Sequence, residues 1–386
     1  MVKVKYLTEG YELCYYFKNM EKQTSFFDID KVNSPTDTEG QIGFLSINVP
    51  EELIIAAGKT PFRVCGSEKP AKLANAYLPK TFDPYVLDSL EGALDGTYSF
   101  LDGVIIANTS DGHRRLYDAW RTGTTFAKVF FLDIPKSSDA LGLKAFNLFL
   151  SHLKRDLTKA FGVKITDEKL RDAIHICNTT RTLLTKLSEK RKSNSIPFTG
   201  KEFFEMAKWC QSKDKQTVNH ALKGFLEKCE KVESNGSQVS TYGPRIMIMG
   251  SFMGTSSFIG LIESLGANVV CEDLCLGMQY FSTEVDEESD NPIASLALRY
   301  LTIPTARMVD TEARWNYLLN ITEEYSIDGI VYFALKFDDT HLFEYPYIKN
   351  KFQKEGYPLL FIEAENFVTN LGQIETRVQA FTEMLV

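Results

Sequence analysis

The sequence has no continuous apolar segment long enough to cross a bilayer, and its first residues, MVKVKYLTEGYELCYYFKN, contain no apolar core typical of a signal peptide. It also has no cluster of basic residues, and the net charge is −8 with a pI near 5.4. These absences argue against nucleic acid or an anionic membrane as the main partner. We therefore expect a cytoplasmic protein that binds neither.

Cysteine is sparse, and no CxxC motif occurs. An odd number of cysteines, dispersed in a chain without a signal peptide, does not predict a disulfide framework. The one close pair is Cys271 and Cys275, and two thiols do not complete a four-ligand metal site. Cys275 follows a predicted strand and is a candidate reactive thiol or lone ligand, although a buried small side chain is the simpler interpretation for both residues.

The 386 residues exceed what one hydrophobic core usually organises, so two domains are expected. Two segments, 42–66 and 245–273, each show an apolar strand, a turn, a helix and a second strand. In the first, Pro50 is predicted at the first helical position with Asn48 near the cap, and Glu51 and Glu52 complement the helix dipole. Such βαβ units predict parallel sheets.

A second repeat supports a duplicated architecture, because LDGVIIANTSD at 101–111 is echoed by IDGIVYFALKFDD at 327–339. We expect an α/β fold of two doubly wound parallel-sheet lobes, related by internal duplication and joined by a helical section. The predicted boundaries are an N-terminal arm (1–41), a first lobe (42–138), a helical section (139–235) and a second lobe (236–386). Residues 233–244 are the clearest linker.

In open α/β sheets, ligands bind beyond the carboxyl ends of the strands. The turns at 46–50, 107–113, 250–256 and 334–341 are therefore predicted to line one cavity between the lobes. The turn at 107–113 combines Ser110 and His113 with the start of a helix, which makes it a candidate site by topology alone.

Five blocks resemble, in order and spacing, the family of 2-hydroxyacyl-CoA dehydratases, which also contains benzoyl-CoA reductase catalytic subunits. The blocks are INVPEELIIAAGKTPFRVCG, DGVIIANTSDGHRRLYDAW, ESLGANVVCEDLCLGMQYF, KFDDTHLFEYPYIK and NLGQIETRVQAF. The resemblance implies a subunit that pairs with a homologous subunit, binds acyl-CoA and holds an iron–sulfur cluster between its lobes. It also implies an ATP-dependent activator protein that supplies one electron, which forms a ketyl radical at the thioester carbonyl.

The sequence departs from the family at the three cluster cysteines that the resemblance implies. Asp83, Ser110 and Asp338 occupy those positions. Iron–sulfur clusters require thiolate ligands, which carboxylates and hydroxyls replace poorly. We therefore expect this chain to bind no cluster or other metal, and we expect the iron–sulfur cluster on the partner subunit.

The candidate catalytic residues are Ser110, His113, Asp83 and Asp338. Asp83, Ser110 and Asp338 could alternatively form an oxygen-rich site for a divalent cation, or serve only as turn and cap residues. His113 and His341 each follow an acidic turn, so either could transfer protons, although a hydrogen-bonded structural role is the alternative.

The candidate cofactor-binding residues, for the CoA moiety, are Arg114, Arg115, Gly250 and Ser251. Arginine suits phosphate, and the glycine turn GSFMGTSSF offers backbone N–H groups to an anion. The alternative for the arginines is an exposed helix face paired with Asp111 or Asp118.

Three functions remain open from the sequence. The first is a cluster-free subunit of a heteromeric dehydratase or reductase. The second is an acyl-CoA hydratase or dehydratase that uses acid–base chemistry at Asp83, His113 and Asp338. The third is a non-catalytic scaffold.

Overall fold

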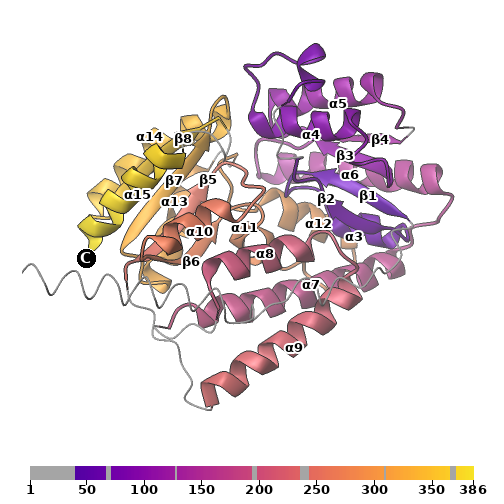
Figure 1. The fold of residues 1–386 in the computed structure, drawn as a ribbon. Helices are drawn as coiled ribbons and strands as arrows, with labels where there is room; N and C mark the ends of the chain where they lie inside the picture. The colour runs from indigo at the N-terminus through magenta and orange to yellow at the C-terminus, as the bar shows by residue number, and fades with distance from the viewer. Residues whose placement is uncertain are drawn as a thin grey trace, which may run out of the picture.

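The computed structural model describes residues 40–66, 71–126, 128–193, 198–234, 243–307, 310–365 and 371–386. Nearly all of the predicted N-terminal arm and most of the predicted linker at 233–244 lie outside these ranges. Two lobes, each built on a four-stranded parallel sheet, lie side by side above a layer of long helices (Figure 1). This arrangement confirms the predicted α/β fold class.

The first lobe has the strand order β2-β1-β3-β4. Its elements are β1 (Gln41–Leu45), α3 (Glu51–Ala56), β2 (Thr60–Arg63), the short 3₁₀ helix η1 (Ala74–Ala76), α4 (Pro84–Leu94), β3 (Leu101–Ala107), α5 (Asp111–Gly123) and β4 (Val129–Leu132). The central strands β1 and β3 are almost wholly buried, as expected for a parallel sheet covered on both faces.

The second lobe has the order β6-β5-β7-β8, which repeats the first lobe's topology. Its elements are β5 (Arg245–Gly250), α10 (Ser257–Ser264), β6 (Asn268–Asp273), α11 (Met278–Phe281), α12 (Pro292–Leu301), α13 (Thr311–Glu324), β7 (Gly329–Leu335), α14 (Asp339–Lys354), β8 (Leu359–Ala364) and α15 (Leu371–Leu385). The shared strand order is what the internal duplication predicts.

The helices between the lobes are α6 (Ala140–Phe161), α7 (Asp167–Lys190), α8 (Gly200–Cys210) and α9 (Lys215–Ser234). α7 packs against α3 of the first lobe and against α11 and α12 of the second, so it runs beneath both (Figure 1). α12 also packs against α6. None of the helices in the described part of the chain is long and apolar enough to span a membrane.

The start of α3 differs from the prediction. Pro50 is the N-cap residue and not the first helical residue, and no side chain caps this helix. Asn48 does not cap α3 because its side-chain amide donates a 2.7 Å hydrogen bond to the carbonyl oxygen of Tyr300 in α12. A contact across the lobes therefore replaces the local cap.

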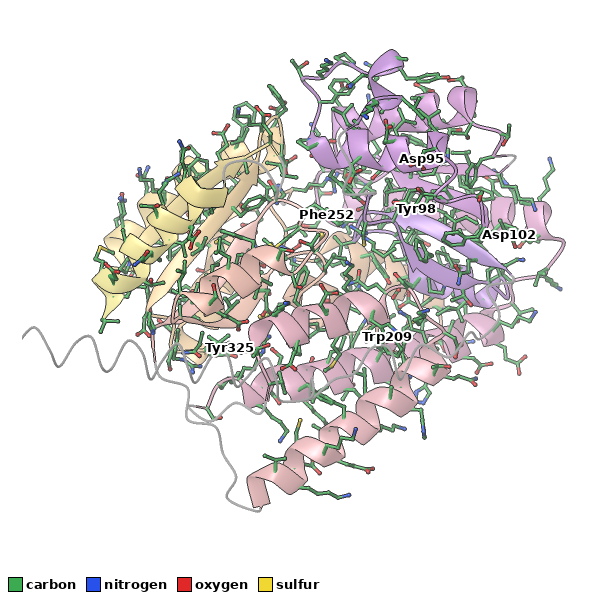
Figure 2. All side chains as sticks on the ribbon, in the orientation of Figure 1. Asp95, Tyr98, Asp102, Trp209, Phe252 and Tyr325 are labelled. Carbon is green, nitrogen blue, oxygen red and sulfur yellow. The ribbon has the colours of Figure 1, made fainter. Side chains whose placement is uncertain are left out.

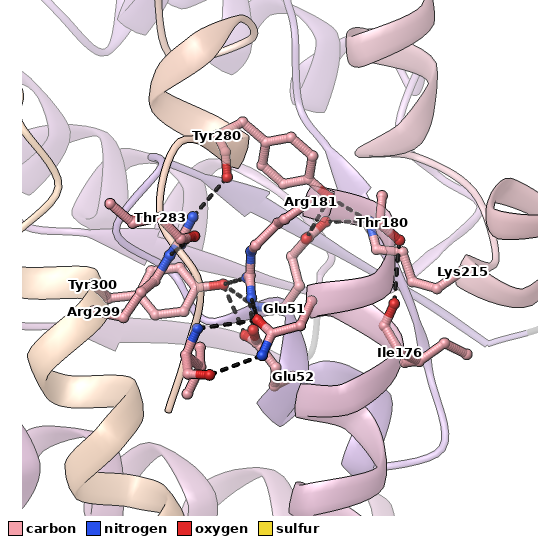
Figure 3. A network of polar contacts seen from close by, with 12 residues as sticks. Glu51, Glu52, Ile176, Thr180, Arg181, Lys215, Tyr280, Thr283, Arg299 and Tyr300 are labelled. Carbon is pink, nitrogen blue, oxygen red and sulfur yellow. Dashed lines mark hydrogen bonds and ion pairs between the residues drawn. The ribbon is translucent and has the colours of Figure 1, made fainter. Parts of the chain in front are cut away.

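Glu51 and Glu52 begin α3 as predicted, but both side chains are buried in a charged network that joins the lobes (Figure 3). The Glu52 carboxylate lies 2.6 Å from Arg181 Nη2 in α7 and accepts a 2.7 Å hydrogen bond from the Tyr300 hydroxyl. Glu51 accepts from Lys215 Nζ at 2.8 Å. Burial opposes the charge on Glu52, but Arg181 and Arg299 hold its pKa below the ordinary value. These pairs fix the first lobe to the helical layer and to α12.

Candidate functional site

A cavity of about 110 Å³ lies between the lobes, at the carboxyl ends of strands from both sheets. All four predicted turns contribute to its wall. The lining residues are Ser46, Ile47, Asn48, Arg63, Asp83, Tyr85, Thr109, Ser110, His113, Gly250, Phe252, Cys275, Gln279, Thr305, Ala306, Arg307, Asp338, Thr340 and His341. Phe252 lies between the lobes (Figure 2) and stacks on Tyr85 with ring centroids 3.8 Å apart.

The three residues at the cluster-cysteine positions are brought together at this cavity, and each is the N-cap of a helix. Asp83 Oδ1 accepts from the backbone N–H of Tyr85 at the start of α4. Ser110 Oγ accepts from the N–H of His113 in α5, and Asp338 Oδ1 accepts from that of His341 in α14. Three helix N-termini, with their partial positive charge, therefore converge on one cavity.

Asp338 is held in an ion pair. His341 Nδ1 lies 2.6 Å from Asp338 Oδ2, and the Ser251 hydroxyl donates to the same oxygen at 2.7 Å. Burial opposes the charge on Asp338, but His341 and Ser251 hold its pKa below the ordinary value. Burial likewise opposes the charge on His341, but Asp338 raises the pKa of the imidazole. Each member of the pair therefore favours the charged form of the other.

Asp83 and His113, in contrast, are held in their uncharged forms. Burial, reinforced by the charge on Asp338, raises the pKa of Asp83 to about 8, so this carboxyl is mainly protonated at neutral pH. Burial, reinforced by Arg63, lowers the pKa of His113 to about 4, so its imidazole is neutral. His113 Nδ1 lies 2.9 Å from Ser110 Oγ. The cavity thus holds a neutral acid beside an ion pair.

Two cavity arginines were missed by the sequence analysis. Arg63, at the carboxyl end of β2, is 2% exposed, and its guanidinium carbon lies 5.4 Å from the Phe44 ring centroid and 5.5 Å from that of Phe252. Arg307 donates to the carbonyl oxygens of Thr109 and Ile134, and burial lowers its pKa to about 10. The sequence signal that could have identified Arg63 was its position at the carboxyl end of a predicted strand, where ligands bind in such folds.

The predicted CoA-binding residues are divided between the cavity and the surface. Arg114 is exposed and bonds Asn108 Oδ1 at 3.3 Å, and Arg115 lies 3.5 Å from Asp111, which matches the exposed-face alternative. Neither is a cavity-lining residue, because successive helical positions rotate away from His113. Gly250 lines the cavity, whereas Ser251 is fully buried and positions Asp338.

Of the close cysteine pair, one thiol lies at the cavity and the other in the core. Cys275 lines the cavity, with its sulfur 3.7 Å from Arg63 Nη2, and burial raises the pKa of its thiol. Cys271 is fully buried in the core, as the simpler interpretation of its sequence position held. Within the described ranges, no three His, Cys, Asp or Glu side chains form a group able to hold a metal ion.

The arrangement is therefore suited to binding an anion and to moving a proton. Asp83 supplies a protonated carboxyl, and Asp338 with His341 supplies a charged relay. Arg63 and Arg307 add positive charge without a carboxylate partner in the part of the chain that the structure describes.

Comparison with known proteins identifies the family of this chain. The model of the 2-hydroxyglutaryl-CoA dehydratase D-component matches residues 46–385. The (R)-phenyllactyl-CoA dehydratase beta subunit of Clostridium sporogenes is 25% identical over 89% of this chain and 91% of its own length. The lactoyl-CoA dehydratase beta subunit of Anaerotignum propionicum is 26% identical over 90% and 92%, and a benzoyl-CoA reductase subunit of Thauera aromatica is 25% identical over 88% and 89%. The chain belongs to the 2-hydroxyglutaryl-CoA dehydratase D-component family.

Proposed function

We propose that this chain is a subunit of a heteromeric, cytoplasmic enzyme of the 2-hydroxyacyl-CoA dehydratase or benzoyl-CoA reductase type. The named relatives are each described as one subunit of such an enzyme. The proposed partner is a homologous subunit that carries the iron–sulfur cluster and receives an electron from an ATP-dependent activator protein. Acyl-CoA binds mainly to that partner or at the boundary between the two subunits.

The observation that carries the cluster-free assignment is the donor set of the cavity. Asp83, Ser110 and Asp338 stand at the expected thiolate positions, and each already caps a helix. Cys275 supplies a thiol, but burial raises its pKa although the neighbouring Arg63 opposes that rise, and one thiol is a single donor. A cluster needs several thiolates, so these residues do not fit one.

Iron and sulfide analysis tests this assignment. The full-length chain, purified anaerobically alone, is expected to contain substoichiometric iron and to show no absorption near the ~400 nm typical of iron–sulfur proteins. Co-expressed with a homologue that has all three cysteines, it is expected to co-purify in a coloured complex that binds a CoA ester. Stoichiometric iron and sulfide in the isolated chain would contradict the proposal.

A gain-of-function variant provides a positive control for the geometry. Substitution of Asp83, Ser110 and Asp338 together by cysteine restores thiolate donors at three positions that line one cavity. We expect the triple variant, reconstituted with iron and sulfide, to acquire a cluster. Failure of a well-folded triple variant to bind iron would show that the cavity no longer has the family's geometry.

A second function, acid–base hydration or dehydration of an acyl-CoA, is favoured by the protonated Asp83 beside the Asp338–His341 pair. Without a reducible cluster, the acidic hydrogen of a thioester is the one next to its carbonyl, so the hydroxyl lost would be on the β carbon. The test is hydration of a 2-enoyl-CoA by the isolated chain. Activity that Asp83→Asn removes and the exposed control Asp156→Asn retains would favour this function over the first.

A further inference from the structure

The Arg63 guanidinium is buried and only partly hydrogen-bonded. Its Nε and Nη1 atoms have no hydrogen-bond partner among the described residues, and Nη2 contacts only Cys275 Sγ at 3.7 Å. A thiol sulfur is a weak acceptor. A buried donor without a strong acceptor costs stability, and a charged donor costs more. The cavity that Arg63 lines is where such an acceptor can bind.

Two aromatic rings lie next to the Arg63 guanidinium. The ring centroids of Phe44 and Phe252 each lie within 6 Å of its central carbon, a distance at which the rings attract the cation and favour its position at the cavity. Either fork of a guanidinium that can grip two oxygens includes Nη2 together with Nε or Nη1. Each fork of Arg63 therefore offers at least one N–H that lacks a partner.

The charges around the cavity favour an anion over a cation. Arg307 adds a second positive charge, and the N-termini of α4, α5 and α14 point their partial positive charge toward the same space. Of the acidic residues in the wall, Asp338 is paired with His341, and Asp83 is predominantly protonated at neutral pH. Positive charge therefore exceeds negative charge at this cavity.

We propose that the cavity is a receptor for a small carboxylate, which Arg63 binds through two parallel N–H···O bonds. A volume of about 110 Å³ accepts a group of a few heavy atoms but not a whole coenzyme. The carboxylate is planar, as the guanidinium fork requires. The ligand is either a free organic acid or the terminal carboxylate of a longer molecule such as an acyl chain. Binding of this carboxylate does not depend on whether a partner holds the cluster.

Calorimetric titration of the full-length chain tests the proposal, at constant ionic strength and with propionate, glutarate and inorganic phosphate as probes. We expect saturable binding of the carboxylates and at least tenfold weaker binding of phosphate. A CoA thioester with a terminal carboxylate and one without it distinguish the two sources of the ligand. If only the thioester with a terminal carboxylate binds, and the free acids do not, the bound carboxylate belongs to an acyl chain.

Two variants and one control locate the binding residue. Arg63→Met keeps a long apolar side chain beside the rings without the charge, so we expect it to abolish carboxylate binding without lowering the melting temperature of the ligand-free protein. Arg63→Lys keeps the charge but loses the fork, and at least a tenfold weaker affinity is expected. Arg155→Gln removes an exposed arginine on α6 and is expected to bind like the wild type.

Three outcomes would overturn the inference. The first is that no carboxylate probe binds, whether free or attached to CoA. The second is that phosphate binds as tightly as the carboxylates. The third is that both Arg63 variants bind the carboxylates with unchanged affinity. Because these measurements use the isolated chain, failure here leaves the proposed role as an enzyme subunit intact. Failure to find a partner likewise leaves the carboxylate measurement valid.

Discussion

Replacement of Arg181 by methionine is predicted to leave Glu52 as a buried carboxylate without its ion-pair partner. Both side chains are fully buried, and they are joined by a 2.6 Å contact across the interface between α7 and α3. Loss of one partner from a buried ion pair typically costs about 3 to 5 kcal/mol. Glu52 keeps its hydrogen bond from Tyr300 and the nearby charge of Arg299, so we expect a loss near the lower end, about 3 kcal/mol.

The pH dependence follows from the sign of the Glu52 pKa shift. In the wild type the pKa of Glu52 is lower in the folded than in the unfolded protein. The ion pair therefore stabilises the fold above the unfolded-state pKa, and this stabilisation is lost as pH falls through the folded-state pKa. Without Arg181, burial dominates and raises the pKa of Glu52. The stability of the variant then falls as pH rises above the pKa that Glu52 has in the unfolded chain. The difference between the two proteins should therefore be larger at pH 7.5 than at pH 5.

Urea unfolding followed by circular dichroism at both pH values measures this difference. The matched control is Lys154→Met, which removes an exposed 2.8 Å pair with Asp167 and should cost less than about 1 kcal/mol. A loss below about 1 kcal/mol for Arg181→Met, or an equal loss at the two pH values, would refute the view that this pair holds the lobes together.

Two further predictions concern the cavity. Gly250→Ala should destabilise the fold by on the order of 3 kcal/mol, because φ is +121° and an added Cβ would collide with the Phe333 carbonyl oxygen. Gly224→Ala in α9 meets no neighbour and should stabilise by about 0.5 to 1 kcal/mol, and thermal unfolding compares the two. Because the pKa of Asp83 is raised to about 8, the contribution of this carboxyl to the free energy of unfolding declines as pH rises from about 4 toward 8. Asp83→Asn should remove this contribution, so urea unfolding should show a difference in stability between variant and wild type that changes across this pH range. A difference that is constant with pH would contradict the assignment of a protonated carboxyl.

The sequence was sufficient to predict the lobes and the place of the cavity. Alternating apolar runs, turns and helices predict parallel βαβ units, and parallel strands necessarily end at the same edge of a sheet. Ser110 and Asp338 could therefore be assigned to one site although more than 200 positions separate them, whereas Asp83 was assigned to it by the family resemblance alone. The cap role of all three also follows locally, because Asp and Ser favour the residue before a helix.

Only the tertiary structure decided which charges lie together. Glu52 pairs with Arg181 and Tyr300, which are far from it in sequence, and no local pattern encodes contacts between separate lobes. The same holds for Arg63, whose missing partners become evident only when the cavity wall is assembled. The protonation of Asp83 is likewise a tertiary property, because it results from burial and from the approach of Asp338 across the cavity. Residue types determined which groups the chain can bring to the site, and packing determined their charge states, because desolvation depends on what surrounds a group in space.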